Sequence, residues 1–324
     1  MAAAEQIKSL IKYFGEGDAD RFYSAALQIA ASEARKGHSN LAQDLKALID
    51  NAKKNRKLEY ADRSKTIPIQ QPQRELKDLI DVFLPRIRLQ DMVLDEGLRQ
   101  ALNKVVHEQR NWQLLQQYNL SPRRKLLLTG PPGCGKTMTA QALAGELGIP
   151  VFIIRLDGLI SKYMGESIAK LRVIFDTMSD NRGVYLFDEF DSIGSHRNMG
   201  QDVGEIKRVL NSFLLNIEQD QSNSIIIAAT NLPEMLDKAL FRRFDDVIQY
   251  PLPTIEEITE TLQKHLQAFD LPQGTDISKL AMKAQRLNYS AIVRACEDAI
   301  KEMILQKKKF LDPADLEKAI ANRK

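Results

Sequence analysis

A glycine-rich octapeptide carries the clearest chemical pattern in the sequence: Gly130-Pro131-Pro132-Gly133-Cys134-Gly135-Lys136-Thr137. It fits the pattern of Gly, four residues, then Gly-Lys-Thr, which is typical of phosphate-binding loops. Glycines let successive backbone N–H groups face a phosphate, and a following helix N-terminus adds partial positive charge. We expect Lys136 to reach the β- and γ-phosphates and the Thr137 hydroxyl to ligate Mg²⁺. The residues predicted to bind the nucleotide here are Pro132, Gly133, Cys134, Gly135, Lys136, Thr137 and Met138.

The flanks of this loop decide between a phosphate site and a chance glycine turn. The run Lys125–Thr129 is short and apolar, as in a buried parallel strand, and Met138–Leu147 is rich in Ala and Leu, as in a helix. Strand, glycine loop and helix is the context that the motif requires. The sequence therefore favours the phosphate site.

Two acids follow a second apolar run, Val184–Phe187. A strand buried on both faces carries no carboxylates inside, so Asp188 and Glu189 should emerge at its carboxyl end, where ligands bind in open α/β sheets. Asp188 is then a candidate Mg²⁺ ligand, and Glu189 is a candidate base that orients the attacking water. The alternative is an acid pair that caps the next helix, and the glycine loop makes the catalytic interpretation the stronger one.

Two further candidates lie downstream. Asn231 follows the apolar run Ile225–Thr230 and could hydrogen-bond the attacking water or the γ-phosphate, although a strand-end Asn often only starts a turn. Arg242 and Arg243 precede Phe244. They could form an internal ion-pair cluster, or reach the nucleotide of a neighbouring subunit and neutralise transition-state charge.

From residue 74 onward helical patterns alternate with short apolar runs, which predicts an α/β fold around a parallel sheet. After residue 253 only helical patterns remain, so a small helical domain should follow the nucleotide domain. We expect an N-terminal helical domain at 1–54, a linker rich in Lys, Pro and Gln at 55–74, the α/β domain at 75–251 and a helical lid at 252–324. The predicted strands are Leu126–Thr129, Val151–Arg155, Val184–Phe187, Ile225–Thr230 and Val247–Tyr250, and the predicted lid helices are Thr254–Phe269, Ile277–Arg286, Ser290–Gln306 and Ala314–Asn322.

Composition narrows the class of protein. The 324 residues carry a net charge of +3, so charge alone does not argue for a nucleic-acid partner. Two cysteines cannot form a disulfide framework, and the four histidines show no metal-ligand spacing. The sequence shows neither a membrane span nor a signal peptide. We therefore predict a cytoplasmic protein.

The order of these motifs resembles the AAA family of ATPases (the AAA+ superfamily) across about residues 75–320. Gly130–Thr137 resembles Walker A, Leu186–Glu189 resembles Walker B, and Asn231 resembles sensor 1. The resemblance implies an Mg²⁺-dependent ATPase that works as a ring, usually of six subunits. It also implies that Arg242 and Arg243 act as arginine fingers in trans. The segment Asp91–Leu94 sits where the adenine-contacting segment of the family normally lies, with Asp91 and Val93 as the candidate contacts.

The lid departs from the family pattern. Leu287–Ile292 aligns with a segment that has Ser-Gly-Ala in many members, but the glycine is missing here. The lid residue that contacts nucleotide is therefore not identified, and Arg294, one turn further on, is a candidate substitute.

A second loop indicates how the protein uses the energy of ATP hydrolysis. Lys162-Tyr163-Met164-Gly165 resembles the substrate-gripping pore loop of AAA protein translocases. Tyr163 and Met164 can pack against any side chain, so a ring of them would hold an extended polypeptide without reading its sequence. The alternative is a half-buried loop aromatic. The polar stretch from Ser195 to Gly204 is a candidate second pore loop.

The whole chain also resembles bacterial ATPases that are paired with a subtilisin-like serine protease in plasmid-exclusion and phage-defence operons. The similar parts are Asp20–Leu27 and Arg294–Lys301. This resemblance implies a role in antiviral defence and a protease partner, since the chain itself offers no protease residues. The competing hypotheses are a nucleic-acid-associated loader, an ATP-dependent assembly switch, and an enzyme acting on small molecules.

Overall fold

The computed structural model describes residues 79–156, 166–191, 203–236, 238–272 and 274–324, together with the isolated positions Ala26 and Gln43. All the contacts discussed below lie within one compact unit of the chain, 71–324. The predicted N-terminal helical domain, the linker and the loop Lys162–Gly165 lie outside the described residues. The domain boundaries therefore stay predictions.

A six-stranded sheet forms the centre of this unit, in the order β1-β3-β4-β5-β2-β6. Strands β3, β4, β5, β2 and β6 pair in parallel, and β1 pairs antiparallel with β3 at the edge. The predicted α/β class with a mostly parallel sheet is confirmed. The strands are β1 Ile80–Phe83, β2 Lys125–Thr129, β3 Val151–Ile154, β4 Val184–Phe187, β5 Ile225–Thr230 and β6 Asp246–Gln249.

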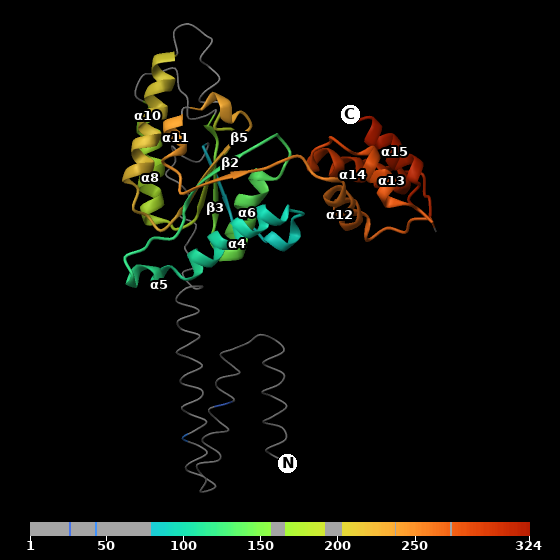
Figure 1. Cartoon of the computed structure of the whole chain (residues 1–324), viewed down its shortest axis with the longest axis horizontal. Helices are drawn as coiled ribbons and strands as arrows, with labels where there is room; N and C mark the ends of the chain where they lie inside the picture. Colours follow the sequence, from blue (N-terminus) through green and yellow to red (C-terminus); the bar gives the residue numbers. More distant parts are fainter. Residues whose placement is uncertain are drawn as a thin grey trace. The chain divides into compact units, whose positions relative to one another are not determined.

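Helices cover both faces of the sheet, as Figure 1 shows. Side chains alternate along each strand, so neighbouring residues enter opposite layers of the core. On β2, Leu127 packs in the layer beneath α8 (Glu166–Asp180), α10 (Val203–Gln219) and α11 (Lys238–Phe241). Leu126 and Leu128 pack in the layer beneath α4 (Glu96–Arg110) and α6 (Lys136–Leu147). The short helices η2 (Leu89–Asp91), α5 (Trp112–Gln117) and η4 (Pro233–Met235) complete this part of the chain.

The four C-terminal helices have a separate apolar core. Thr254 caps the first of them through a capping box with Glu257, and Asp276, Asn288 and Asp312 cap the other three. These helices match the four predicted ones to within a few residues at each end. They are α12 Ile255–Leu266, α13 Ile277–Lys283, α14 Tyr289–Leu305 and α15 Pro313–Ala321.

The structure differs from the sequence analysis in two places. The sequence analysis did not predict strand β1, because Ile80–Phe83 is short and only Ile80 of its four residues is buried. The predicted loop from Ser195 to Gly204 ends earlier than expected, since α10 already begins at Val203. The rest of that loop lies outside the described residues. No described helix is long and apolar enough to cross a membrane.

Candidate functional site

The glycine loop joins β2 to α6, and its backbone requires glycine at several positions. Gly133 and Gly135 have φ angles of 72° and 96°, in the left-handed region that side chains disfavour. At Gly130, with φ of 139°, a Cβ atom would lie 2.1 Å from the Tyr250 carbonyl oxygen. The loop therefore takes a backbone form that only this glycine pattern allows, with the N-terminus of α6 at its end.

Lys136 is buried and lies folded against the loop. Its Nζ donates to the carbonyl oxygens of Gly130 and Pro131, at 2.7 and 2.8 Å, and to Asn231 Oδ1 at 2.8 Å. Burial lowers the pKa of this amine, and the nearby acids Asp188 and Asp191 partly oppose that change. The nearby acids therefore compensate the buried Lys136 ammonium only in part, and phosphate oxygens can supply the remaining negative charge.

Thr137 and Asp188 meet as the metal prediction requires. Thr137 Oγ1 donates to Asp188 Oδ2 at 2.5 Å, and the other Asp188 oxygen accepts the backbone N–H of Glu189 at 2.9 Å. A hydroxyl and a carboxylate that converge beside the glycine loop are the oxygen donors that Mg²⁺ prefers. These residues therefore fit Mg²⁺ bound together with the phosphates of ATP.

Glu189 is exposed at the carboxyl end of β4 and has a positive φ of 51°. Non-glycine residues adopt this conformation rarely, and often at functional sites. The turn is fixed on its far side, because the Phe190 N–H donates to the Ala229 carbonyl oxygen at 2.8 Å. The carboxylate is therefore presented to solvent at the edge where the phosphates would lie.

Asn231 is held by a residue that the sequence analysis did not identify. Asp191 Oδ1 accepts the Asn231 N–H at 3.0 Å and the Thr230 hydroxyl at 3.1 Å. Since Asn231 Oδ1 in turn accepts from Lys136, one chain of hydrogen bonds runs from Asp191 to the loop. An acid three residues after Asp188 was the only available signal in the sequence.

The predicted adenine segment lies beside α6, and its contact with adenine stays a prediction. Asp91 is exposed, and its carboxylate caps η2 by accepting the Arg88 N–H at 2.8 Å, while Val93 is half-buried. The residue between them, Met92, is buried, and its Sδ lies 4.0 Å from Thr139 Oγ1 of α6. A Cβ atom on Gly135 would lie 3.4 Å from Met92 Cε, so Met92 also packs on the glycine loop, a contact that the sequence analysis missed.

The lid touches the loop through the start of α14. The Ser290 N–H donates to the Gly133 carbonyl oxygen at 3.1 Å, and a Cβ atom on Gly133 would lie 2.7 Å from the Asn288 side chain. Asn288 Oδ1 also caps α14 by accepting the Ala291 N–H. Arg294 is exposed, and its role in contacting nucleotide stays a prediction.

The two arginines differ in their surroundings. Arg242 is exposed, whereas Arg243 forms an ion pair with Glu218 of α10, at 2.9 Å. The internal ion pair was one of the two alternatives for this dipeptide, and it applies to Arg243. The action of either arginine in trans stays a prediction.

Comparison with known proteins agrees with this geometry. Residues 126–252 match the family model described as "ATPase family associated with various cellular activities (AAA)". The AAA family ATPase y4kL of Sinorhizobium fredii is 33% identical over 320 residues, which cover 99% of this chain and 95% of that protein. The chain belongs to the AAA family of ATPases. As in that family, its reaction is the hydrolysis of ATP, which AAA ATPases bind with Mg²⁺.

Two other relatives are matched over less of their length. The ATP-dependent zinc metalloprotease FtsH of Caulobacter vibrioides is 29% identical over 72% of this chain and 38% of its own length. A putative 26S proteasome regulatory subunit homolog of Methanothermobacter thermautotrophicus is 30% identical over 62% of this chain and 55% of its own. The similarity to these two proteins is thus confined to part of each.

Proposed function

We propose that this AAA ATPase assembles into a ring, of six subunits by family analogy, and uses ATP to remodel or unfold protein. The proposal rests on the convergence of Lys136, Thr137 and Asp188 at one edge of the sheet. The printed names of two relatives, a protease and a proteasome regulatory subunit, support protein as the substrate.

In the proposed reaction each described side chain has one task. Lys136 exchanges its contacts with loop carbonyls for oxygens of the β- and γ-phosphates. Thr137 and Asp188 would hold Mg²⁺, which would neutralise charge on the phosphates. Glu189 accepts the proton of the attacking water, and Asn231 orients that water or the γ-phosphate. Arg242 of a neighbouring subunit would stabilise the transition state.

Threading of a polypeptide past Tyr163 and Met164 would use the energy of hydrolysis. These residues lie outside the described part of the chain, so the sequence carries this part of the proposal. In the sequence these residues lie between β3 and α8, and β3 belongs to the sheet that holds the catalytic acids. Movement between subunits would therefore move the loop.

Two substitutions separate hydrolysis from substrate handling. Glu189→Gln should bind ATP yet lower its turnover by about 10²- to 10⁴-fold, the usual share of a general base. Tyr163→Ala should keep turnover but lose the unfolding of a fluorescent protein that carries an unstructured tail. Tyr118→Ala, at an exposed tyrosine of the α/β domain, is the matched control and should keep both activities. Equal loss of both activities in Tyr163→Ala would contradict the pore-loop role.

We further propose that a separate subtilisin-like serine protease receives the unfolded protein, as a bacterial defence system. The resemblance of Asp20–Leu27 and Arg294–Lys301 to such ATPases is the support for this pairing. The test is reconstitution: cleavage of the tailed protein should require ATP, the protease and this chain together. Cleavage that proceeds equally well with Glu189→Gln would contradict the coupling.

A further inference from the structure

A small pocket lies at the edge of the sheet opposite the ATP site. Its lining comes from α4, α5, the segment 121–124 before β2, Arg182 before β4, and the segment 220–223 before β5. These segments lead into the amino ends of β2, β4 and β5, whereas the phosphate-binding residues lie at the carboxyl ends. The pocket has a volume of about 220 Å³. It is thus separate from the nucleotide.

Buried hydrogen bonds fix the walls of the pocket. Ser224 Oγ accepts the Gly183 N–H at 3.2 Å and donates toward the carbonyl oxygens of Met178 and Asn181, at 3.1 and 3.3 Å. Ser224 is fully buried. The segments before β4 and β5 are therefore tied together, and Arg182 lies between two residues of this network.

Asp220, the one acid among the described residues that line the pocket, is already neutralised. Asp220 pairs with Arg124, which donates to both its carboxylate and its carbonyl oxygen. The Ser222 hydroxyl donates to the same carboxylate oxygen, at 3.2 Å, and the Ser222 N–H donates to the other, at 3.3 Å. Asp220 therefore has little capacity left for a second cation.

Arg182 is the second cation of the pocket. Among the described residues its buried Nε has no hydrogen-bond partner. Arg124 and Arg182 against Asp220 leave one positive charge on the lining, and the other polar lining residues are uncharged. The buried Nε–H has an unmet hydrogen bond, and the guanidinium that carries it lines the pocket, where an oxyanion would accept its N–H donors.

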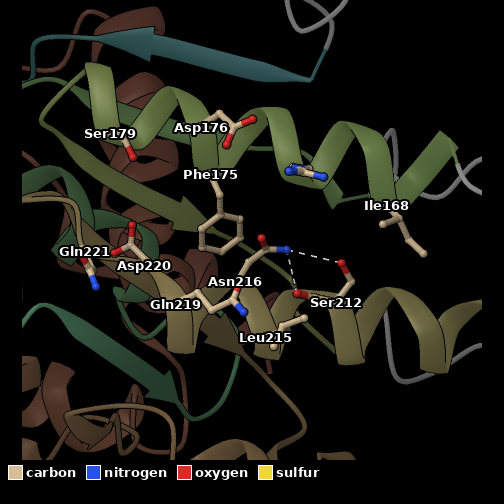
Figure 2. A pocket seen from close by; sticks show the side chains of 11 residues that line it. Ile168, Phe175, Asp176, Ser179, Ser212, Leu215, Asn216, Gln219, Asp220 and Gln221 are labelled. Atoms are coloured by element: carbon tan, nitrogen blue, oxygen red, sulfur yellow. Dashed lines mark hydrogen bonds between the residues drawn. The ribbon is translucent and has the colours of Figure 1, made fainter.

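We propose that this pocket binds a small oxyanion, a carboxylate or a phosphate, through the Arg182 guanidinium. With a volume of about 220 Å³ the pocket is smaller than the roughly 300–1,000 Å³ typical of small-molecule sites, so a compact group suits it. Shared residues, Asp220 and Gln221, connect the pocket to a larger groove between α8 and α10 (Figure 2), which leaves an approach for a ligand with a longer body.

Trp112 provides a direct test, because it lines the pocket and the chain has a single tryptophan. The protein, saturated with Mg²⁺ and a non-hydrolysable ATP analogue to fill the whole ATP site, is titrated with inorganic phosphate, with succinate and with chloride at equal ionic strength. We expect a saturable change of tryptophan fluorescence with phosphate, succinate or both, and none with chloride. Saturation by phosphate alone identifies a phosphate site, and saturation by succinate alone identifies a carboxylate site.

Arg182→Gln should weaken the saturable binding by about 10- to 100-fold, the range for a lost hydrogen bond to a charged group. Its ATP turnover should stay unchanged. Arg172→Gln is the matched control, because this exposed arginine lines the neighbouring groove and should leave binding intact. If Arg182→Gln does not fold, Arg182→Lys, which keeps the charge but loses the planar fork, should still weaken binding. Equal saturation in the substituted and original proteins, or no saturable response to either anion, would overturn the proposal.

Discussion

At the residue scale, Lys136 donates hydrogen bonds to a few protein oxygens, and the oxygens of a triphosphate can replace them. Lys136 Nζ contacts two loop carbonyls and the side-chain oxygen of Asn231. Phosphate oxygens carry full negative charge, so they compete well for these N–H donors. Asn231 would then be released towards the γ-phosphate in the same step. The contact between Lys136 and Asn231 thus couples nucleotide binding to the predicted sensor.

Asp191 should matter for turnover although we expect no contact between it and ATP. Asp191→Ala removes the acceptor for the Asn231 N–H and the Thr230 hydroxyl, so Asn231 should lose its position. We expect the kcat for ATP to fall by about 10- to 100-fold, corresponding to about 1–3 kcal/mol for an unmade hydrogen bond, with KM little changed. Steady-state ATPase measurement over a range of ATP concentrations gives both constants.

Asp191→Asn is the matched control, because its amide oxygen can accept the same two hydrogen bonds without the charge. Activity close to normal in Asp191→Asn would assign the role to positioning. An equal loss in both proteins would point instead to the negative charge beside Lys136, and normal kcat in Asp191→Ala would contradict the prediction.

Local sequence patterns could predict only some of the site residues. Lys136 and Thr137 follow from the spacing of one motif, and Asp188 and Asn231 follow because parallel strands bring their carboxyl ends together. Asn288 could not be found in this way, because its place above Gly133 depends on the packing of the lid against the loop. Long-range contacts of this kind leave no spacing in the sequence.

At the element scale, the central strands β2 to β5 were predictable because each is an apolar run that is largely buried on both faces. In β6 only Ile248 is buried, and the predicted strand Val247–Tyr250 lies one residue further along the chain than the observed one. The order of the strands in the sheet was not predictable, because apolar runs carry no record of which neighbour they pair with. Strand β1 escaped prediction for a different reason: Asp81 and Phe83 are exposed on an edge strand, so the apolar pattern is weak. Pairing with β3, rather than burial, defines this strand.

Helix α6 is fixed to the segment before η2 by a close backbone contact at Gly145. A Cβ atom there would lie 2.1 Å from the Ile87 carbonyl oxygen and 3.2 Å from the Ile87 carbonyl carbon. Gly145→Ala would normally favour a helix, by up to about 1 kcal/mol. Here the clash with backbone should dominate, and we expect a loss of about 2–3 kcal/mol in the free energy of unfolding.

Chemical denaturation monitored by circular dichroism would measure this loss. Gly97→Ala is the matched control, since its nearest neighbour is the Asp95 carboxylate oxygen, at 3.1 Å, a side-chain atom that can shift. We expect this second change to be within about 1 kcal/mol of the original protein. Equal stability of the two substituted proteins would show that the contact at Gly145 relaxes freely.

At the scale of the whole molecule, two described contacts could transmit a change of nucleotide state from the phosphate-binding loop to the lid. One is the contact between Ser290 and Gly133. The other is Tyr250, whose hydroxyl donates to Thr139 of α6 at 2.7 Å, just before the predicted lid begins at residue 252. Both contacts begin in the phosphate-binding loop or in its helix. A change in the loop on hydrolysis would therefore be felt by the lid.

The proposed ring makes a prediction that a single subunit cannot satisfy. Glu189→Gln and Arg242→Ala should each show almost no ATP turnover alone, because the first lacks the base and the second lacks the arginine that a neighbour should supply. Mixed together, an Arg242→Ala subunit beside a Glu189→Gln subunit forms one complete site from intact halves. For random mixing in a closed ring about one quarter of the sites should recover, since each of the two required neighbours is present half of the time.

The control mixture, Glu189→Gln with Lys136→Ala, damages the same half of the site twice and should stay inactive. Recovery is measured as ATP turnover at fixed total protein, with size-exclusion chromatography to show that mixed oligomers form. Mixed oligomers without recovery above the control would mean that Arg242 does not act across subunits.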